Sequence, residues 1–133
     1  MTRKYDVAAL GNAIMDVIAP VDDRFLLTHG IAKGAMTLID EFRATELHKA
    51  LHDTHQSAGG SAANTMAGLA SLGGRGVVVG KVFDDALGAR FGESLAAIGV
   101  DYSTRRATSG SPTASCMIAV TPDGQRSMST YLG

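Results

Sequence analysis

A pair of adjacent glycines constrains this chain more than any other feature. They lie within Ser57-Ala58-Gly59-Gly60-Ser61-Ala62-Ala63-Asn64-Thr65, where missing side chains let the backbone approach another group closely. An apolar stripe with helical spacing follows at Ala62, Met66, Leu69 and Leu72. The segment therefore predicts a tight turn into a helix with Asn64 on its first turn. Unpaired N–H groups and the positive end of the helix dipole suit a polar or anionic small molecule there.

Short apolar runs alternate with helical patterns along much of the chain. Residues 7–10 and 77–79 predict buried strands, the second of the kind found in parallel sheets. Asp40 is a candidate N-cap for a helix that extends to about His52. Asp84 or Asp85 is a candidate N-cap for a second helix, which ends at Gly99. This alternation predicts an α/β protein with a parallel βα core.

Other segments predict strands that connect to one another without helices. They are residues 13–21, 35–39 and 114–131, which indicate a separate small sheet. Thr121-Pro122-Asp123-Gly124 predicts the turn of a hairpin between the last two strands, whereas residues 22–34 have no clear pattern. Two parallel strands alone would leave apolar faces poorly covered, so we expect the chain to be the first part of a larger domain.

Composition excludes several classes of protein. Twelve basic and 13 acidic residues give a net charge of −1, which does not favour binding to nucleic acid or to an anionic membrane. The sequence has no apolar run near the length of a membrane helix and no secretory signal. The one cysteine, Cys116, rules out an internal disulfide, so we expect a cytoplasmic protein.

The local sequence around the double glycine leaves two interpretations open. No Gly-Lys-Ser/Thr follows, so the turn is not a Walker A loop, and an ordinary strand-to-helix connection fits as well as a ligand site. Asn12 and Asp16, just after the first strand, favour the ligand site, because ligands of open α/β sheets bind at the carboxyl ends of strands. A carboxylate can accept hydrogen bonds from both hydroxyls of a diol, and an amide can donate and accept.

Three segments together resemble the PfkB (ribokinase-like) family of sugar and nucleoside kinases. They are Gly11-Asn12-Ala13-x-x-Asp16, then Gly59-Gly60-Ser61-Ala62-Ala63-Asn64, and Gly80 to Gly88, which departs from the family pattern at Phe83. Residues 121–128 are similar to the family's lid hairpin. The Gly-Asn-x-x-x-Asp opening and Arg126-Ser127 most resemble adenosine kinases.

The resemblance implies a Rossmann-like ribokinase fold, incomplete here, with a parallel βα core and a small β lid. Residues 1–133 would be the N-terminal part of one kinase domain, with lid segments at about 13–39 and 101–131. By the same resemblance Asn12, Asp16, Gly59, Gly60, Ser61 and Asn64 would bind the substrate. Arg126 would approach the transferring phosphoryl group, where a guanidinium stabilises the spreading charge. A solvent-facing hairpin position is the alternative for Arg126.

The family's Gly-Ala-Gly-Asp signature, which supplies the general base and anion hole, is absent from this sequence, as is the ATP-binding half. The resemblance therefore implies part of an ATP- and Mg²⁺-dependent kinase, most similar to adenosine kinase, that is inactive as an isolated chain. A ribokinase- or hexose-type sugar kinase differs only in the acceptor. A non-catalytic binding or interaction module is the alternative of another class, and the lid offers an edge for oligomer formation.

Three further residue types have structural explanations that we favour. His48 and His52 are four apart, but a solvated helix face is the preferred interpretation and no metal site is predicted. Cys116 and Met36 lie on predicted lid strands, where core packing is favoured over contact with a nucleobase.

Overall fold

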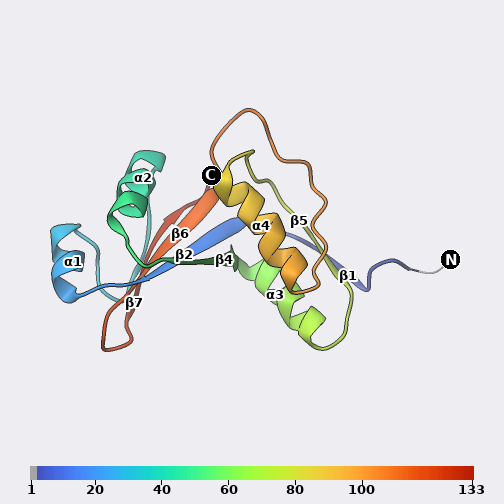
Figure 1. Cartoon of the computed structure of the whole chain (residues 1–133), viewed down its shortest axis with the longest axis horizontal. Helices are drawn as coiled ribbons and strands as arrows, with labels where there is room; N and C mark the ends of the chain where they lie inside the picture. The colour runs from blue at the N-terminus through green and yellow to red at the C-terminus, as the bar shows by residue number, and fades with distance from the viewer. Residues whose placement is uncertain (1–2) are drawn as a thin grey trace. The chain divides into compact units, whose positions relative to one another are not determined.

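The computed structural model describes residues 3–133, which divide into two compact units (Figure 1). The first unit comprises the chain up to Met15 together with Ser57–Thr113, and the second comprises Asp16–Gln56 and Ala114–Gly133. Each unit has its own cluster of buried apolar side chains.

The first unit is built on two parallel strands, β1 (Val7–Leu10) and β5 (Gly76–Val79), with Val7 opposite Gly76. Helix α3 (Ser61–Ser71) contacts both strands. The predicted helix, its end before Gly73 and the parallel strand pair are confirmed. The prediction of a buried first strand is wrong, because three of the four residues of β1 are exposed, Leu10 to 83%.

Helix α4 (Ala86–Ala97) begins at Asp85, whose carboxylate Oδ1 accepts a hydrogen bond from the Gly88 amide at 2.7 Å. Phe91 and Leu95 fill the core of the unit, whereas Ile98 lies beyond the helix and is exposed. Leu72 of the α3 stripe is also exposed, since it follows the last helical residue. A stripe continues inward only while the chain remains helical.

The second sheet has five strands in the order β3-β7-β6-β2-β4. They are β2 (Ile14–Pro20), β3 (Met36–Leu38), β4 (His55–Gly59), β6 (Ala114–Val120) and β7 (Arg126–Tyr131). Strands β6 and β7 form the predicted antiparallel hairpin, with Val120 opposite Arg126, and β3 pairs in parallel with β7. Strands β2 and β4 each contribute residues to both units.

The helices of the second unit are α1 (Asp23–Thr28) and α2 (Glu41–Ala50). The N-cap at Asp40 is confirmed by a 2.8 Å hydrogen bond from the Arg43 amide to its carboxylate. Helix α2 contacts β6 and β7 (Figure 1), and Leu47 packs with Met117 in the core of the unit. No helix within residues 3–133 is both long and apolar enough to cross a bilayer.

Candidate functional site

The glycine turn lies in the first unit, between the last residue of β4 and the start of α3. Gly60 has a φ of +88°, and a Cβ built there would lie 2.8 Å from the Asn12 carbonyl oxygen and 3.1 Å from Ile14 Cγ2. The contact with the carbonyl oxygen is closer than a Cβ tolerates, the contact with the Ile14 methyl is tight, and the positive φ strains any other residue, so the position strongly favours glycine. The turn and the chain after β1 are therefore packed directly against each other.

Helix α3 begins without a side-chain cap. Its N-cap is Gly60, whose carbonyl oxygen accepts a hydrogen bond from the Asn64 amide at 3.0 Å. The earlier N–H groups of an α-helix have no intrahelical acceptor. Gly59 is buried, whereas Ser61 and Asn64 present their side chains to solvent. A polar ligand at this helix start would meet backbone donors together with a hydroxyl and an amide.

Asn12 follows β1 in the same unit and its side chain is exposed. It lies beyond Gly11, whose amide donates to the Val79 carbonyl at 3.2 Å and so extends the β1–β5 pairing by one residue. The structure thus brings the Asn12 backbone against the turn that carries Gly60. This close contact could not be predicted from the spacing of the two motifs along the chain.

Asp16 belongs to the second unit, where it is half-buried on β2. Burial raises the pKa of the Asp16 carboxyl, and the positive charge of Arg126 lowers it in part. Arg126 is the first residue of β7 and is exposed. A carboxylate that is partly desolvated yet has no strong ion pair is well suited to accept hydrogen bonds from ligand hydroxyls.

Cys116 and Met36 have different environments. The Cys116 thiol is buried and receives a hydrogen bond from the Thr130 hydroxyl at 3.3 Å, while burial raises its pKa. The packing role that the sequence favours for it is consistent with this burial. For Met36 the packing prediction is wrong, because β3 borders the sheet and its side chain is 56% exposed.

The histidines form no metal site in the described part of the chain. Helix α2 ends at Ala50, so His52 no longer continues the helical face of His48. Among residues 3–133 no three His, Cys, Asp or Glu side chains are grouped so that they can hold a metal ion.

Gln56 is a polar residue near the turn that sequence reasoning missed. Its side-chain Oε1 is buried and accepts no hydrogen bond from any described residue. Buried acceptors are costly when unpaired, so this oxygen invites a donor from water or a ligand. The only sequence signal was its place in the polar stretch just before the double glycine.

Residues 4–133 match the model of the pfkB family of carbohydrate kinases. The chain belongs to this family. A comparison with curated protein sequences gave no match. The parallel βα unit and the separate five-stranded sheet therefore belong to the ribokinase-type α/β fold that the motifs predicted.

Several solved structures of the family are similar to the chain. Adenosine kinase from Sinorhizobium meliloti is 52% identical with a TM-score of 0.85, over 98% of this chain and 40% of that one. A probable sugar kinase protein from Rhizobium etli CFN 42 is 45% identical with a TM-score of 0.85, over 99% and 40%. Anopheles gambiae adenosine kinase in complex with P1,P4-di(adenosine-5) tetraphosphate is 25% identical with a TM-score of 0.81, over 94% and 38%. The chain thus spans 38–40% of the length of these relatives.

Proposed function

We propose that the chain is the N-terminal, acceptor-binding part of an ATP-dependent nucleoside kinase whose substrate is adenosine. The observation that carries the proposal is the 52% identity to the Sinorhizobium meliloti adenosine kinase over nearly the whole of this chain. The close contact between Gly60 and the Asn12 backbone supports the proposal, because it explains why the family motif has a glycine at this position.

In this proposal the site residues bind the hydroxyl groups of the ribose. The half-buried carboxylate of Asp16 accepts hydrogen bonds from two neighbouring hydroxyls. The side chains of Asn12 and Asn64 donate and accept, and the backbone at Gly59, Gly60 and Ser61 supplies further polar groups. The second unit, which holds Asp16 and Arg126, is the lid of the kinase.

The reaction transfers a phosphoryl group to the 5′-hydroxyl. The hydroxyl oxygen forms a bond to the γ-phosphorus, the bond from that phosphorus to the ADP oxygen breaks, and the hydroxyl proton passes to a base. The guanidinium of Arg126 stabilises charge on the phosphoryl oxygens. The base and the anion hole belong to the Gly-Ala-Gly-Asp motif, and ATP binds to the other half of the kinase domain. These 133 residues contain neither, so the chain alone does not catalyse transfer.

A sugar kinase is the second candidate, because the probable sugar kinase from Rhizobium etli is 45% identical over the same residues. It would use the same hydroxyl-binding residues but no nucleobase contacts. A non-catalytic binding module and a dimer formed through the lid remain further candidates. A cytoplasmic location stays a prediction from the single cysteine.

Isothermal titration of the 133-residue chain with adenosine, ribose and fructose tests the proposal. We expect adenosine to bind and Asp16→Asn to weaken it about tenfold or more, since a charge-assisted hydrogen bond is lost. Glu46→Gln removes an exposed carboxylate of the same unit and should leave the affinity unchanged. Tighter binding of a free sugar would favour the sugar kinase, and equal loss in both variants would refute the Asp16 role. Turnover with ATP by this chain would contradict the missing base.

A further inference from the structure

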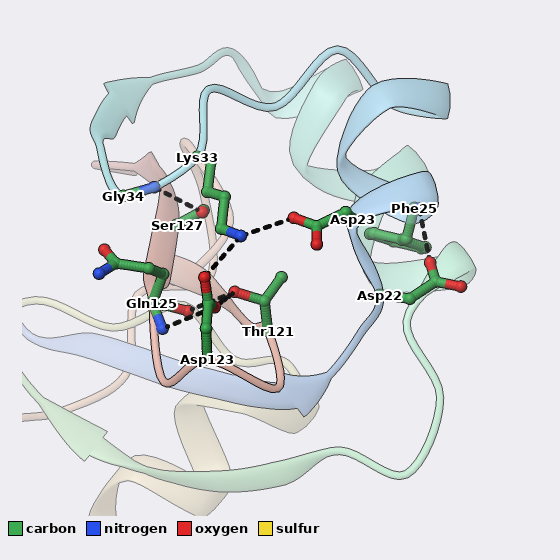
Figure 2. Close-up of polar contacts among 9 residues, drawn as sticks. All are labelled: Asp22, Asp23, Phe25, Lys33, Gly34, Thr121, Asp123, Gln125 and Ser127. Atoms are coloured by element: carbon green, nitrogen blue, oxygen red, sulfur yellow. Dashed lines mark hydrogen bonds and ion pairs between the residues drawn. The ribbon is translucent and has the colours of Figure 1, made fainter.

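Lys33 joins two segments of the second unit that are far apart in the sequence. It lies in the loop between α1 and β3, and its Nζ is 2.7 Å from Asp23 Oδ1 and 2.7 Å from Asp123 Oδ2 (Figure 2). Asp23 is the first residue of α1, and Asp123 lies in the turn between β6 and β7. One ammonium group therefore links the hairpin turn to the start of a helix.

Backbone contacts extend this link along the hairpin. The Gly34 amide donates to Ser127 Oγ at 2.9 Å (Figure 2). The Met128 amide donates to the Ala35 carbonyl at 2.8 Å. Ser127 is fully buried. The loop at residues 33–35 thus runs beside the hairpin from its turn to the first residues of β7, and Arg126 lies between the attached points.

The two oxygens of Asp123 have separate partners. Oδ1 accepts hydrogen bonds from Thr121 Oγ1 at 2.6 Å and from the Gln125 amide at 3.4 Å, and these shape the turn itself. Oδ2 faces Lys33. The hydrogen bonds from Lys33 and Thr121 lower the pKa of Asp123 to about 2, so the carboxylate stays ionised throughout the physiological range. The charge of Asp123, and with it the attraction to Lys33, therefore does not change with pH near neutrality.

We propose that Lys33 is a positioning residue that clamps the β6–β7 turn and so holds Arg126 in the place from which its guanidinium acts. The role of Arg126 in phosphoryl transfer rests on the proposed function, but the clamp itself does not. Its three side chains are each more than one-third exposed, and exposed ion pairs add little to global stability. We therefore expect the clamp to order the turn without determining whether the unit folds.

Asp16 provides a direct reporter of where Arg126 lies. The charge of Arg126 lowers the pKa of Asp16, against the rise caused by burial. Movement of Arg126 away from this place removes the lowering effect, so the Asp16 pKa rises. Cys116 is the other titratable group that interacts with Asp16, and its thiol is uncharged over the range in which the carboxyl titrates.

An NMR titration of the Asp16 carboxyl carbon in the 133-residue chain tests the clamp. We expect its pKa to rise in Lys33→Met and to return to the wild-type value in Lys33→Arg, which keeps the charge. Exchange of the Gly124 and Gln125 amides should be about three- to tenfold faster in Lys33→Met and unchanged in helix α2.

Asp123→Asn is the decisive variant, since it retains Oδ1 and replaces only the oxygen that faces Lys33. Loss of an anion by itself lowers the pKa of a nearby carboxyl, whereas release of Arg126 raises it. A raised Asp16 pKa in Asp123→Asn supports the clamp. A lowered or unchanged value overturns it, even if Lys33→Met fails to fold. Adenosine titration tests the proposed function separately, so either idea can fail without the other.

Discussion

At the scale of single residues, Gly60 and Asp16, both positions of the candidate site, are not the residues that would make the fold most stable. Gly60 combines a left-handed backbone with contacts too close for a side chain. Asp16 carries a carboxyl whose pKa is raised by burial. Each is costly for folding alone, and such costs are common at binding sites.

Gly60→Ala should lower the free energy of unfolding by about 2–4 kcal/mol, because backbone strain and a clash with the Asn12 carbonyl add together. Gly73→Ala is a matched control, since Gly73 has a φ of +84° but nothing within 4 Å of the new Cβ. The free energy of unfolding of Gly73→Ala should fall by only about 1 kcal/mol. Urea denaturation measures both. Equal losses would mean that the contact with Asn12 is absent in solution.

Asp16→Asn should stabilise the ligand-free chain at neutral pH. The folded-state pKa of Asp16 is raised, because burial disfavours the charge more than Arg126 favours it. Its ionisation therefore opposes folding as the pH rises above the unfolded value near 3.8. The variant should gain stability over the wild type between pH 3 and pH 7 in urea denaturation. A difference that shrinks with rising pH would contradict the burial of the carboxylate.

At the scale of elements, three helices begin in the same way and one does not. Asp22, Asp40 and Asp85 each accept a hydrogen bond from the amide three residues later, whereas α3 begins at Gly60 without a side-chain cap. A capping side chain would occupy the helix start that a ligand is proposed to use. The missing cap thus marks the element that carries the candidate site.

Asp85→Ala should cost more than an ordinary N-cap. Besides capping α4, the Asp85 carboxylate accepts hydrogen bonds from the Thr113 amide at 3.0 Å and hydroxyl at 2.7 Å. Thr113 is buried, so its amide would be left unpaired, and its hydroxyl would keep only the long 3.4 Å contact with the Phe83 carbonyl. We expect a loss of about 2–4 kcal/mol, against about 1 kcal/mol for Asp40→Ala, which removes a cap alone. Thermal unfolding of both variants measures the difference, and similar losses would contradict the Thr113 contribution.

The type of most elements could be predicted from the sequence. Helical periodicity and the residues that flank each helix predicted the bounds of α3 and α4 to within a residue or two. The turn residues Pro122-Asp123-Gly124 predicted the β6–β7 hairpin. Strand β4 was missed, because His55-Gln56-Ser57-Ala58-Gly59 has neither β-branched residues nor alternation. Helix α1 was missed as well, since its six residues are too few to show a period.

At the scale of the whole molecule, acidic side chains determine how stability depends on pH. The Asp6 pKa is lowered by hydrogen bonds from Arg75, and the Asp101 pKa by its hydrogen bond with Tyr5. Desolvation raises the Asp85 pKa, but hydrogen bonds from Thr113 and Gly88 outweigh it and the net shift is downward. Asp123 has a pKa of about 2. These groups stabilise the fold above their unfolded pKa near 3.8.

We therefore expect the free energy of unfolding to fall as the pH decreases from 4 towards 2, mainly through Asp85, because the exposed ion pairs of Asp6 and Asp123 contribute little. Urea denaturation across this range measures the loss. High salt should reduce the contributions of Asp6 and Asp123, whose partners are exposed cations. It should leave most of the contribution of Asp85, which depends on hydrogen bonds within the fold. A pH dependence at 1 M salt that Asp85→Ala does not reduce would contradict this assignment.

The sequence by itself determined the family and most of the elements, but not β4 or α1, because helix caps, periodicity and the glycine turn are local patterns that short segments carry. Only the tertiary structure decided that β3 pairs with β7, that β1 and Leu72 are exposed, and that Lys33 reaches both Asp23 and Asp123. These features depend on contacts between residues distant in the chain. Such contacts follow from the path of the folded backbone, which no local pattern encodes.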